Sequence, residues 1–418
     1  MTRRSTTCLR SDAVRAWKRT RWMMSGTPTR AQTQSPPAAG AALLIFLVAV
    51  VLASPLAHGE PYIPKNDAVV LERLPAGSAT RQLEPLRRAV QRNPQDLRAT
   101  LQLAQGYLQI GRETSDPRFN SYAQAALAPW MQQPDPPAPV LVLEATALQS
   151  LHRFDESLAL LDRALAMDPG NAQALLTKAN LLQLKGDFNS ARSACRRLAL
   201  SAEPSAAYIC MASVDSMTGR LESSYRALQR MARGSADADP ALMAWMRGQL
   251  GEMAVRLGER RAAQTHFEEA LELTPDDPYL LAVYADLLLL EGRHQAVIEL
   301  LRDRASSDAL LLRLAIAAHR AGDAEAARWS ELFDARRRAT RPDVNPHLRE
   351  HARFALDVLD QPQRALALAR SNWENQREPA DVRLYWRAAR LAGAVEDERR
   401  LQAWMRATAY EDSTLLAE

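Results

Sequence analysis

Two copies of one helical pattern lie in tandem between residues 138 and 205. Ala145 and Leu148 of the first copy are followed 34 positions later by Ala179 and Leu182. Apolar residues recur three and four positions apart within each copy, which gives each predicted helix one apolar stripe. A helix pair this short cannot bury both stripes by itself, so successive pairs have to stack on one another. The sequence therefore predicts a helical solenoid.

The pattern extends along most of the chain. Gly186, Gly258 and Gly292 fall where one predicted helix ends and the next begins, as glycine does at helix joints. Runs of Val, Ile and Thr with period two are absent from the body, and aromatic residues make up only 6% of the chain, so we expect almost no strand. Copies span 97–133, 138–204 (two copies), 205–238, 244–277, 278–307, 308–340, 346–377 and 380–410.

The best single copy resembles the tetratricopeptide repeat (TPR) family, whose consensus places small residues, glycine, an aromatic residue and proline at fixed positions. The matching residues are Leu250, Gly251, Gly258, Ala263, Phe267, Ala270 and Pro275. The resemblance implies an all-α, right-handed superhelical solenoid of about eight TPR-like helix pairs. The last two copies are degenerate, as expected of terminal repeats that expose to water a face that inner repeats bury.

The chain divides by pattern and composition into five parts. We expect residues 1–59 to be an N-terminal region with a signal peptide or anchor, and residues 60–80 to be an extended linker. Residues 81–133 form an N-terminal cap and a lengthened repeat with an elaborated turn, 138–340 the core array, and 341–418 degenerate repeats and a cap.

The N-terminal region has the features of a secretory signal. Residues 41–53 form one apolar run, preceded by basic residues and followed by Pro55 and the small-x-small site at Ala57-His58-Gly59. The run is shorter than the ~20 apolar residues of a spanning helix, but uncharged neighbours lengthen it. Two alternatives follow. Cleavage would give a periplasmic or secreted protein, whereas an uncleaved segment over 41–57 would anchor periplasmic repeats to the inner membrane.

The basic charge of the whole chain belongs to this N-terminal region. The formal net charge is +4, but residues 1–59 contain eight of the Lys and Arg residues against Asp12 alone. The remaining chain carries 45 basic and 48 acidic residues, a net charge of −3. A nucleic-acid partner is therefore not predicted.

The resemblance also implies a binding surface, because the first helix of each TPR pair lines the concave side of the superhelix. Amides on successive repeats can bond the backbone of an extended peptide, and aromatic residues can anchor a side chain. The alternative is an ordinary solvated polar face. The corresponding positions are Thr146, Gln149, Asn180, Gln183, Trp245, Glu252, Arg256, Tyr279 and Asp286.

Two cysteines, Cys195 and Cys210, lie fifteen positions apart in adjacent copies. In an oxidising compartment a disulfide between them is possible. The alternative is that Cys195 is a small core residue.

One short motif suggests chemistry. His347, Glu350 and His351 match the His-x-x-Glu-His string of a zinc peptidase class. Asn345-Pro346 before the motif instead favours the start of an ordinary repeat helix. We find no phosphate-binding glycine loop and no nucleophile paired with a base, and we predict neither cofactor nor metal.

Together these features predict a non-enzymatic scaffold of the bacterial cell envelope. It would bind a protein or peptide partner in the groove of the superhelix, in envelope assembly, secretion or polymer export. The alternatives are a membrane-anchored assembly subunit and a zinc-dependent hydrolase built on His347.

Overall fold

The computed structural model describes residues 78–201, 204–234, 239–339 and 347–416. These residues fold into helices and connecting turns, and no strand occurs among them. None of the helices in these ranges is long and apolar enough to cross a membrane. The expected signal or anchor over 41–57 lies outside the described residues.

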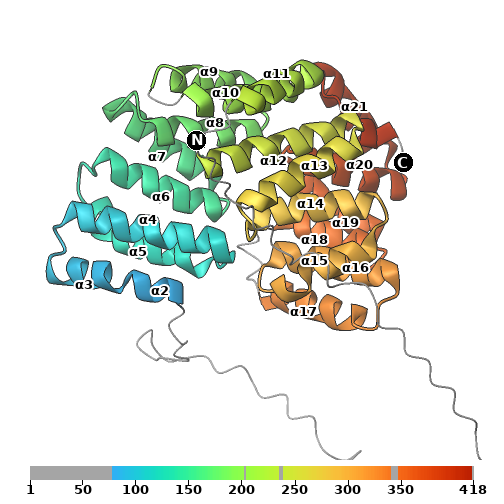
Figure 1. Cartoon of the computed structure of the whole chain (residues 1–418), viewed down its shortest axis with the longest axis horizontal. Coiled ribbons are helices and arrows are strands. Elements are labelled where there is room, and N and C mark those ends of the chain that lie inside the picture. Colours follow the sequence, from blue (N-terminus) through green and yellow to red (C-terminus); the bar gives the residue numbers. More distant parts are fainter. Residues whose placement is uncertain (1–77, 202–203, 235–238, 340–346, 417–418) are drawn as a thin grey trace, which may run out of the picture. The chain divides into compact units, whose positions relative to one another are not determined.

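In the described part of the chain, nine successive helix pairs follow two short N-terminal helices (Figure 1). The fold is therefore the expected all-α TPR-like array, and its nine described pairs agree with the expectation of about eight. The N-terminal helices are α2 (Ser78–Gln82) and α3 (Glu84–Arg92). The first four pairs are α4 (Leu97–Thr114) with α5 (Arg118–Met131), α6 (Ala138–Ser150) with α7 (Phe154–Met167), α8 (Ala172–Leu184) with α9 (Phe188–Leu198), and α10 (Pro204–Ser216) with α11 (Leu221–Gly234).

The remaining five pairs continue without interruption of the pattern. They are α12 (Pro240–Leu257) with α13 (Arg260–Leu273), α14 (Pro278–Leu290) with α15 (His294–Leu301), α16 (Asp308–Ala321) with α17 (Ala326–Ala339), α18 (Leu348–Asp357) with α19 (Pro362–Trp373), and α20 (Pro379–Leu391) with α21 (Val395–Thr408). Two short 3-10 helices, η1 (Arg302–Arg304) and η2 (Ser413–Leu416), complete the described chain.

The predicted glycine joints lie where helices end. Gly258 is the C-cap residue of α12 with φ +81°, and Gly186 and Gly292 adopt φ of +81° and +70° just after α8 and α14. This left-handed conformation is favourable for glycine because glycine has no Cβ. At the other ends, Asp239 and Asp277 cap α12 and α14 by accepting main-chain N–H groups. The turns are thus encoded locally.

Close packing inside a pair depends on small residues. A Cβ added to Gly251 of α12 would lie 2.4 Å from the ring of Phe267 on α13. Both residues are buried, and Ala263 and Ala270 flank the same contact as fully buried residues. The consensus glycine is therefore the position where the aromatic ring of the second helix approaches the first helix most closely.

The repeat over 97–133 differs from expectation in where its extra residues go. They extend α4 to 18 residues, and only Ser115 to Pro117 separate α4 from α5. The repeat is thus lengthened through its first helix instead of through an elaborated turn. Ser115 ends α4 in the left-handed conformation, with φ +53°.

A disulfide joins Cys195 of α9 to Cys210 of α10, with the two Cα atoms 5.7 Å apart. The bond links the second helix of one pair to the first helix of the next. Both cysteines are buried, so they also contribute to the core between these pairs.

The C-terminal repeats pack against the middle of the array. One buried cluster contains residues of α6 to α10 together with residues of α18 to α21 and Leu415. The main-chain N–H of Arg377 donates to the carbonyl oxygen of Leu184 at 2.8 Å, and the rings of Phe188 and Trp404 lie 6.4 Å apart. The array therefore curls until helices more than 180 positions apart along the chain are in contact.

Candidate functional site

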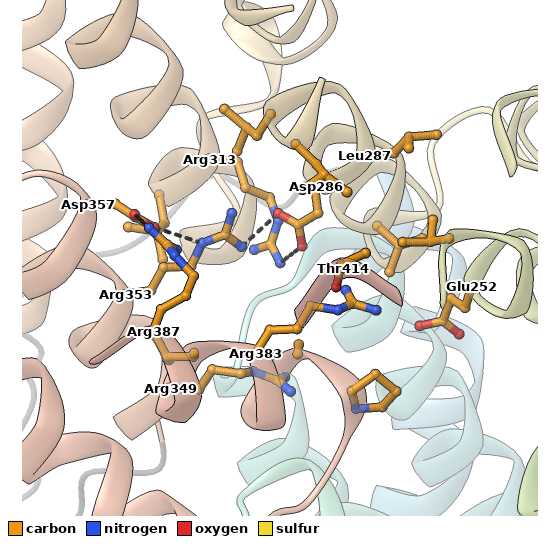
Figure 2. A pocket seen from close by; sticks show the side chains of 18 of the residues that line it. Glu252, Asp286, Leu287, Arg313, Arg349, Arg353, Asp357, Arg383, Arg387 and Thr414 are labelled. Atoms are coloured by element: carbon orange, nitrogen blue, oxygen red, sulfur yellow. Dashed lines mark hydrogen bonds and ion pairs between the residues drawn. The ribbon is translucent and has the colours of Figure 1, made fainter. Parts of the chain in front are cut away.

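The first helices of successive pairs contact one another from α12 through α14, α16 and α18 to α20. Together they surround a cavity of about 280 Å³, which η2 closes on one side. We call this space the arginine cavity, because six arginines lie among its lining residues. They are Arg313 and Arg320 of α16, Arg349 and Arg353 of α18, and Arg383 and Arg387 of α20. Figure 2 labels all of them except Arg320.

Two aspartates of the cavity are shared among four of these arginines. Asp286 of α14 pairs with Arg313 and Arg353, each at 2.6 Å. Figure 2 shows these contacts as dashed lines between Asp286 and its two partners. Asp357 of α18 is bonded at 2.8 Å by both Arg320 and Arg387 and lies 3.4 Å from Arg353. The network thus ties three consecutive first helices to α20.

Both carboxylates are held ionised by this arrangement. Burial alone would raise their pKa values, because it penalises the charged form. The neighbouring guanidinium groups outweigh burial: Arg313 and Arg353 hold the pKa of Asp286 below its ordinary value, and Arg387, Arg353 and Arg320 do the same for Asp357.

Glu252 of α12 lines the opposite side of the cavity and behaves differently. Its Oε1 accepts a hydrogen bond of 2.8 Å from the hydroxyl of Tyr279, and its Oε2 accepts one of 3.0 Å from the Gln249 amide. No arginine pairs with Glu252 among the described ion pairs. Burial therefore dominates and raises the pKa of Glu252 to about 7.

Three of the predicted groove residues thus meet in one place. Glu252 and Asp286 line the arginine cavity, and Tyr279 is bonded to Glu252. They lie on α12 and α14, the first helices of two successive pairs, as the TPR resemblance implied.

The predicted positions on α6 and α8 lie elsewhere. Asn180 is exposed, whereas Gln183 donates a 3.0 Å hydrogen bond from its amide to Ser213 of α10. Thr146 donates its hydroxyl to the carbonyl oxygen of Val142 in its own helix. Gln149 and Trp245 are half-buried, and Trp245 packs against the apolar core of the middle repeats.

The prediction for Arg256 needs correction. Its side chain is only 3% exposed, so it offers no surface to a partner. The guanidinium donates to the carbonyl oxygen of Glu411 at 3.1 Å and to the hydroxyl of Ser216 at 3.1 Å, and it lies 4.8 Å from the ring centroid of Tyr410. The chain's own C-terminal segment, residues 409–416, occupies the position predicted for the partner.

The zinc-peptidase motif does not form a metal site in the described part of the chain. The ring of His347 packs at 5.3 Å against His152, while the ring of His351 lies 6.5 Å from that of Phe333. Glu350 faces Arg349 at 3.5 Å. Among the described residues, no group of three His, Cys, Asp or Glu side chains is arranged to hold a metal ion.

None of the six arginines in the cavity was predicted as a site residue from the sequence, and four of them lie in the degenerate repeats, where the TPR consensus gives no register. The spacing of these residues in the sequence does indicate that they share helix faces. Arg349, Arg353 and Asp357 are four positions apart, as are Arg383 and Arg387, so each set lies on one helix face.

Comparisons with known proteins agree with the repeat pattern. Residues 148–214 and 246–277 match two models described as tetratricopeptide repeat. A search of curated protein sequences found no match.

Several solved structures resemble the chain. Human IFIT1, solved as a dimer with PPP-AAAA, is 13% identical, with a TM-score of 0.46 over 79% of this chain and 78% of that one. Yeast Tom70 is 11% identical, with a TM-score of 0.38 over 79% and 82%. A tetratricopeptide repeat protein from Parabacteroides merdae is 14% identical, with a TM-score of 0.32 over 68% and 96%.

Proposed function

Because the chain is a tetratricopeptide repeat protein, we propose that it is a non-enzymatic scaffold of the bacterial cell envelope that holds a partner polypeptide. Repeats of this kind are scaffolds for protein–protein interaction, and stacked repeats create extended concave binding surfaces. The single observation that carries the proposal is the uninterrupted contact of first helices from α4 to α20, a continuous stack on which polar side chains such as Asn180 of α8 are exposed.

The expected export signal supports the envelope assignment. The basic stretch, apolar run and small-x-small site before residue 60 are the parts of a secretory signal. The disulfide between Cys195 and Cys210 fits an oxidising compartment, where such bonds persist. We therefore place the repeats in the periplasm, serving envelope assembly, secretion or polymer export.

The polar surface of the earlier repeats is the second part of the proposed binding surface. Asn180 is exposed on α8, and the neighbouring Gln183 retains a carbonyl oxygen while its amide bonds Ser213. An extended polypeptide needs such groups, because its main-chain N–H and C=O must be satisfied when it leaves water.

Replacing Asn180 and Gln183 together by alanine tests this proposal. We expect the double variant to lose crosslinked partner in a periplasmic pull-down while its helical circular dichroism stays unchanged. The matched control replaces Asn189 and Glu222, which are exposed on the second helices α9 and α11. Equal partner recovery from the double variant and the native protein would remove α8 from the binding surface.

A membrane-anchored form of the same scaffold is the alternative, because residues 41–57 have no charged side chain. The mass of the mature protein distinguishes the cleaved form from the membrane-anchored form. A polypeptide that begins near residue 60 shows cleavage, and one that retains residues 41–57 in the membrane fraction shows an anchor.

A further inference from the structure

We propose that the arginine cavity is a binding site for an oxyanion, a carboxylate or a phosphate group, held by Arg320 and Arg353. The proposal goes beyond scaffolding, because a free oxyanion can bind here whether or not a polypeptide is held. The same chemistry also fits an acidic side chain of a partner, and the experiment below separates these two sources.

The first argument is local charge. Four arginines, Arg313, Arg320, Arg353 and Arg387, meet two aspartates, Asp286 and Asp357, and the Glu350 carboxylate, which acts electrostatically on Arg313. The other ions that line the cavity have separate partners. Arg349 pairs with Glu378 at 2.6 Å and lies 3.5 Å from both Glu350 and Asp381, and Arg383 pairs with Asp412 at 2.8 Å. The positive excess therefore stays at the Asp286–Asp357 side of the cavity.

The second argument is desolvation. The side chains of Arg313 and Arg353 are only 10% and 19% exposed. A guanidinium withdrawn from water is stable when it is paired and fully hydrogen-bonded, and here each aspartate is divided among several donors. Arg313 also donates to the carbonyl oxygens of Ala282 and Ala309, so an additional anion would accept N–H groups of Arg353 and Arg320.

The third argument is shape. A guanidinium presents its N–H donors in a planar fork that matches the paired oxygens of a carboxylate or phosphate. Arg320 is 32% exposed, so an anion can reach it from solvent. The cavity of about 280 Å³ is somewhat smaller than a typical pocket for a drug-sized ligand, and it suits a small anion or one acidic side chain.

The experiment measures binding to the mature full-length protein by isothermal titration calorimetry at constant ionic strength. One arm uses inorganic phosphate, with chloride as the reference anion. The other arm uses a blocked peptide with two adjacent glutamates, with its glutamine counterpart as the reference. Saturable binding of phosphate indicates a free anion, and binding of the glutamate peptide alone indicates an acidic side chain of a partner. Either result supports the site.

The variants are Arg353→Gln and Arg320→Gln, with Arg328→Gln as the control. Removing Arg353 leaves Asp286 paired with Arg313, so the fold keeps part of the network. Arg328 is 67% exposed and pairs with Glu325 outside the cavity. We expect at least tenfold weaker binding in both cavity variants and unchanged binding in the control.

The proposal is overturned if neither probe binds the native protein, or if both cavity variants bind as tightly as the control. Partner capture through α8 is measured separately by the pull-down above. A negative calorimetry result would therefore refute the oxyanion site without refuting the scaffold proposal. A negative pull-down result would refute partner capture through α8 without affecting the calorimetry result.

Discussion

The guanidinium of Arg256 donates a hydrogen bond of 3.1 Å to the main-chain carbonyl oxygen of Glu411, 155 positions further along the chain. The carboxylate of Glu411 in turn accepts the main-chain N–H of Leu221 at 3.2 Å. One residue after Glu411, Asp412 pairs with Arg383 of α20 at 2.8 Å. The C-terminal segment is thus held between α10 to α12 on one side and α20 on the other, next to the arginine cavity.

Replacing Arg256 by methionine should detach this segment. The substitution removes charge-assisted hydrogen bonds to Glu411 and Ser216 and leaves the Ser216 acceptor unsatisfied in a buried place. We expect the free energy of unfolding to fall by about 2–3 kcal/mol. Urea denaturation measures the loss, and amide hydrogen exchange should be faster over 409–416. Arg226→Met is the control, because Arg226 forms an exposed pair with Glu222; equal effects of the two changes would contradict the assigned role.

Gly251→Ala should destabilise the pair of α12 and α13. The new methyl group would lie 2.4 Å from the ring of Phe267, which is fully buried, so the ring or the helices would have to shift. Overpacking of this kind costs about 1–3 kcal/mol. Gly234→Ala is the matched control, since a Cβ at Gly234 meets nothing within 4 Å. Thermal unfolding of the two variants checks the prediction, and a stable Gly251→Ala protein would argue against this helix register.

Reduction should weaken the array at α9 and α10. The bond between Cys195 and Cys210 closes a loop with a sequence separation of 15. A loop of this length stabilises the folded state by roughly 3 kcal/mol in the chain-entropy model. Unfolding in urea with and without a thiol reductant measures the difference. The Cys195→Ala, Cys210→Ala double variant should already be weaker and should not respond to reductant.

Glu252 should make stability fall as the pH rises from about 4.5 to about 7. Its folded pKa of about 7 lies above the ordinary value of 4.5, so the unfolded chain loses this proton first. Ionisation therefore favours the unfolded state across that window, and below pH 4.5 the effect disappears. The Glu252→Gln variant should lack this contribution. Unfolding free energies of both proteins between pH 4 and 8 should converge at low pH and separate toward pH 7; parallel curves would show that Glu252 titrates normally.

The joints and inner contacts of the repeats could be predicted from the sequence because they depend on single residues. Gly258 and Gly292 adopt the left-handed conformation that a helix end favours, and Gly251 is small where Phe267 approaches. Such requirements act within one repeat and determine the residue type at a single position, so they can be recognised in the sequence.

The cavity could not be predicted, because it depends on how far the array curls. Arg383 reaches Asp412, and Arg256 reaches Glu411, only after small rotations at many successive repeats have accumulated. No local sequence pattern encodes the total of these small rotations. For the same reason Arg256 was expected to face a partner, although the C-terminal segment covers it.

The most direct test of the scaffold account is site-specific photocrosslinking in the living cell. The crosslinking residue is placed at Asn180, which is exposed on the first helix α8, and in parallel at Glu222, which is exposed on the second helix α11. The account predicts that Asn180 yields a discrete crosslinked polypeptide, identified by mass, that Glu222 does not yield. Crosslinks from Glu222 alone, or no polypeptide from either position, would contradict it.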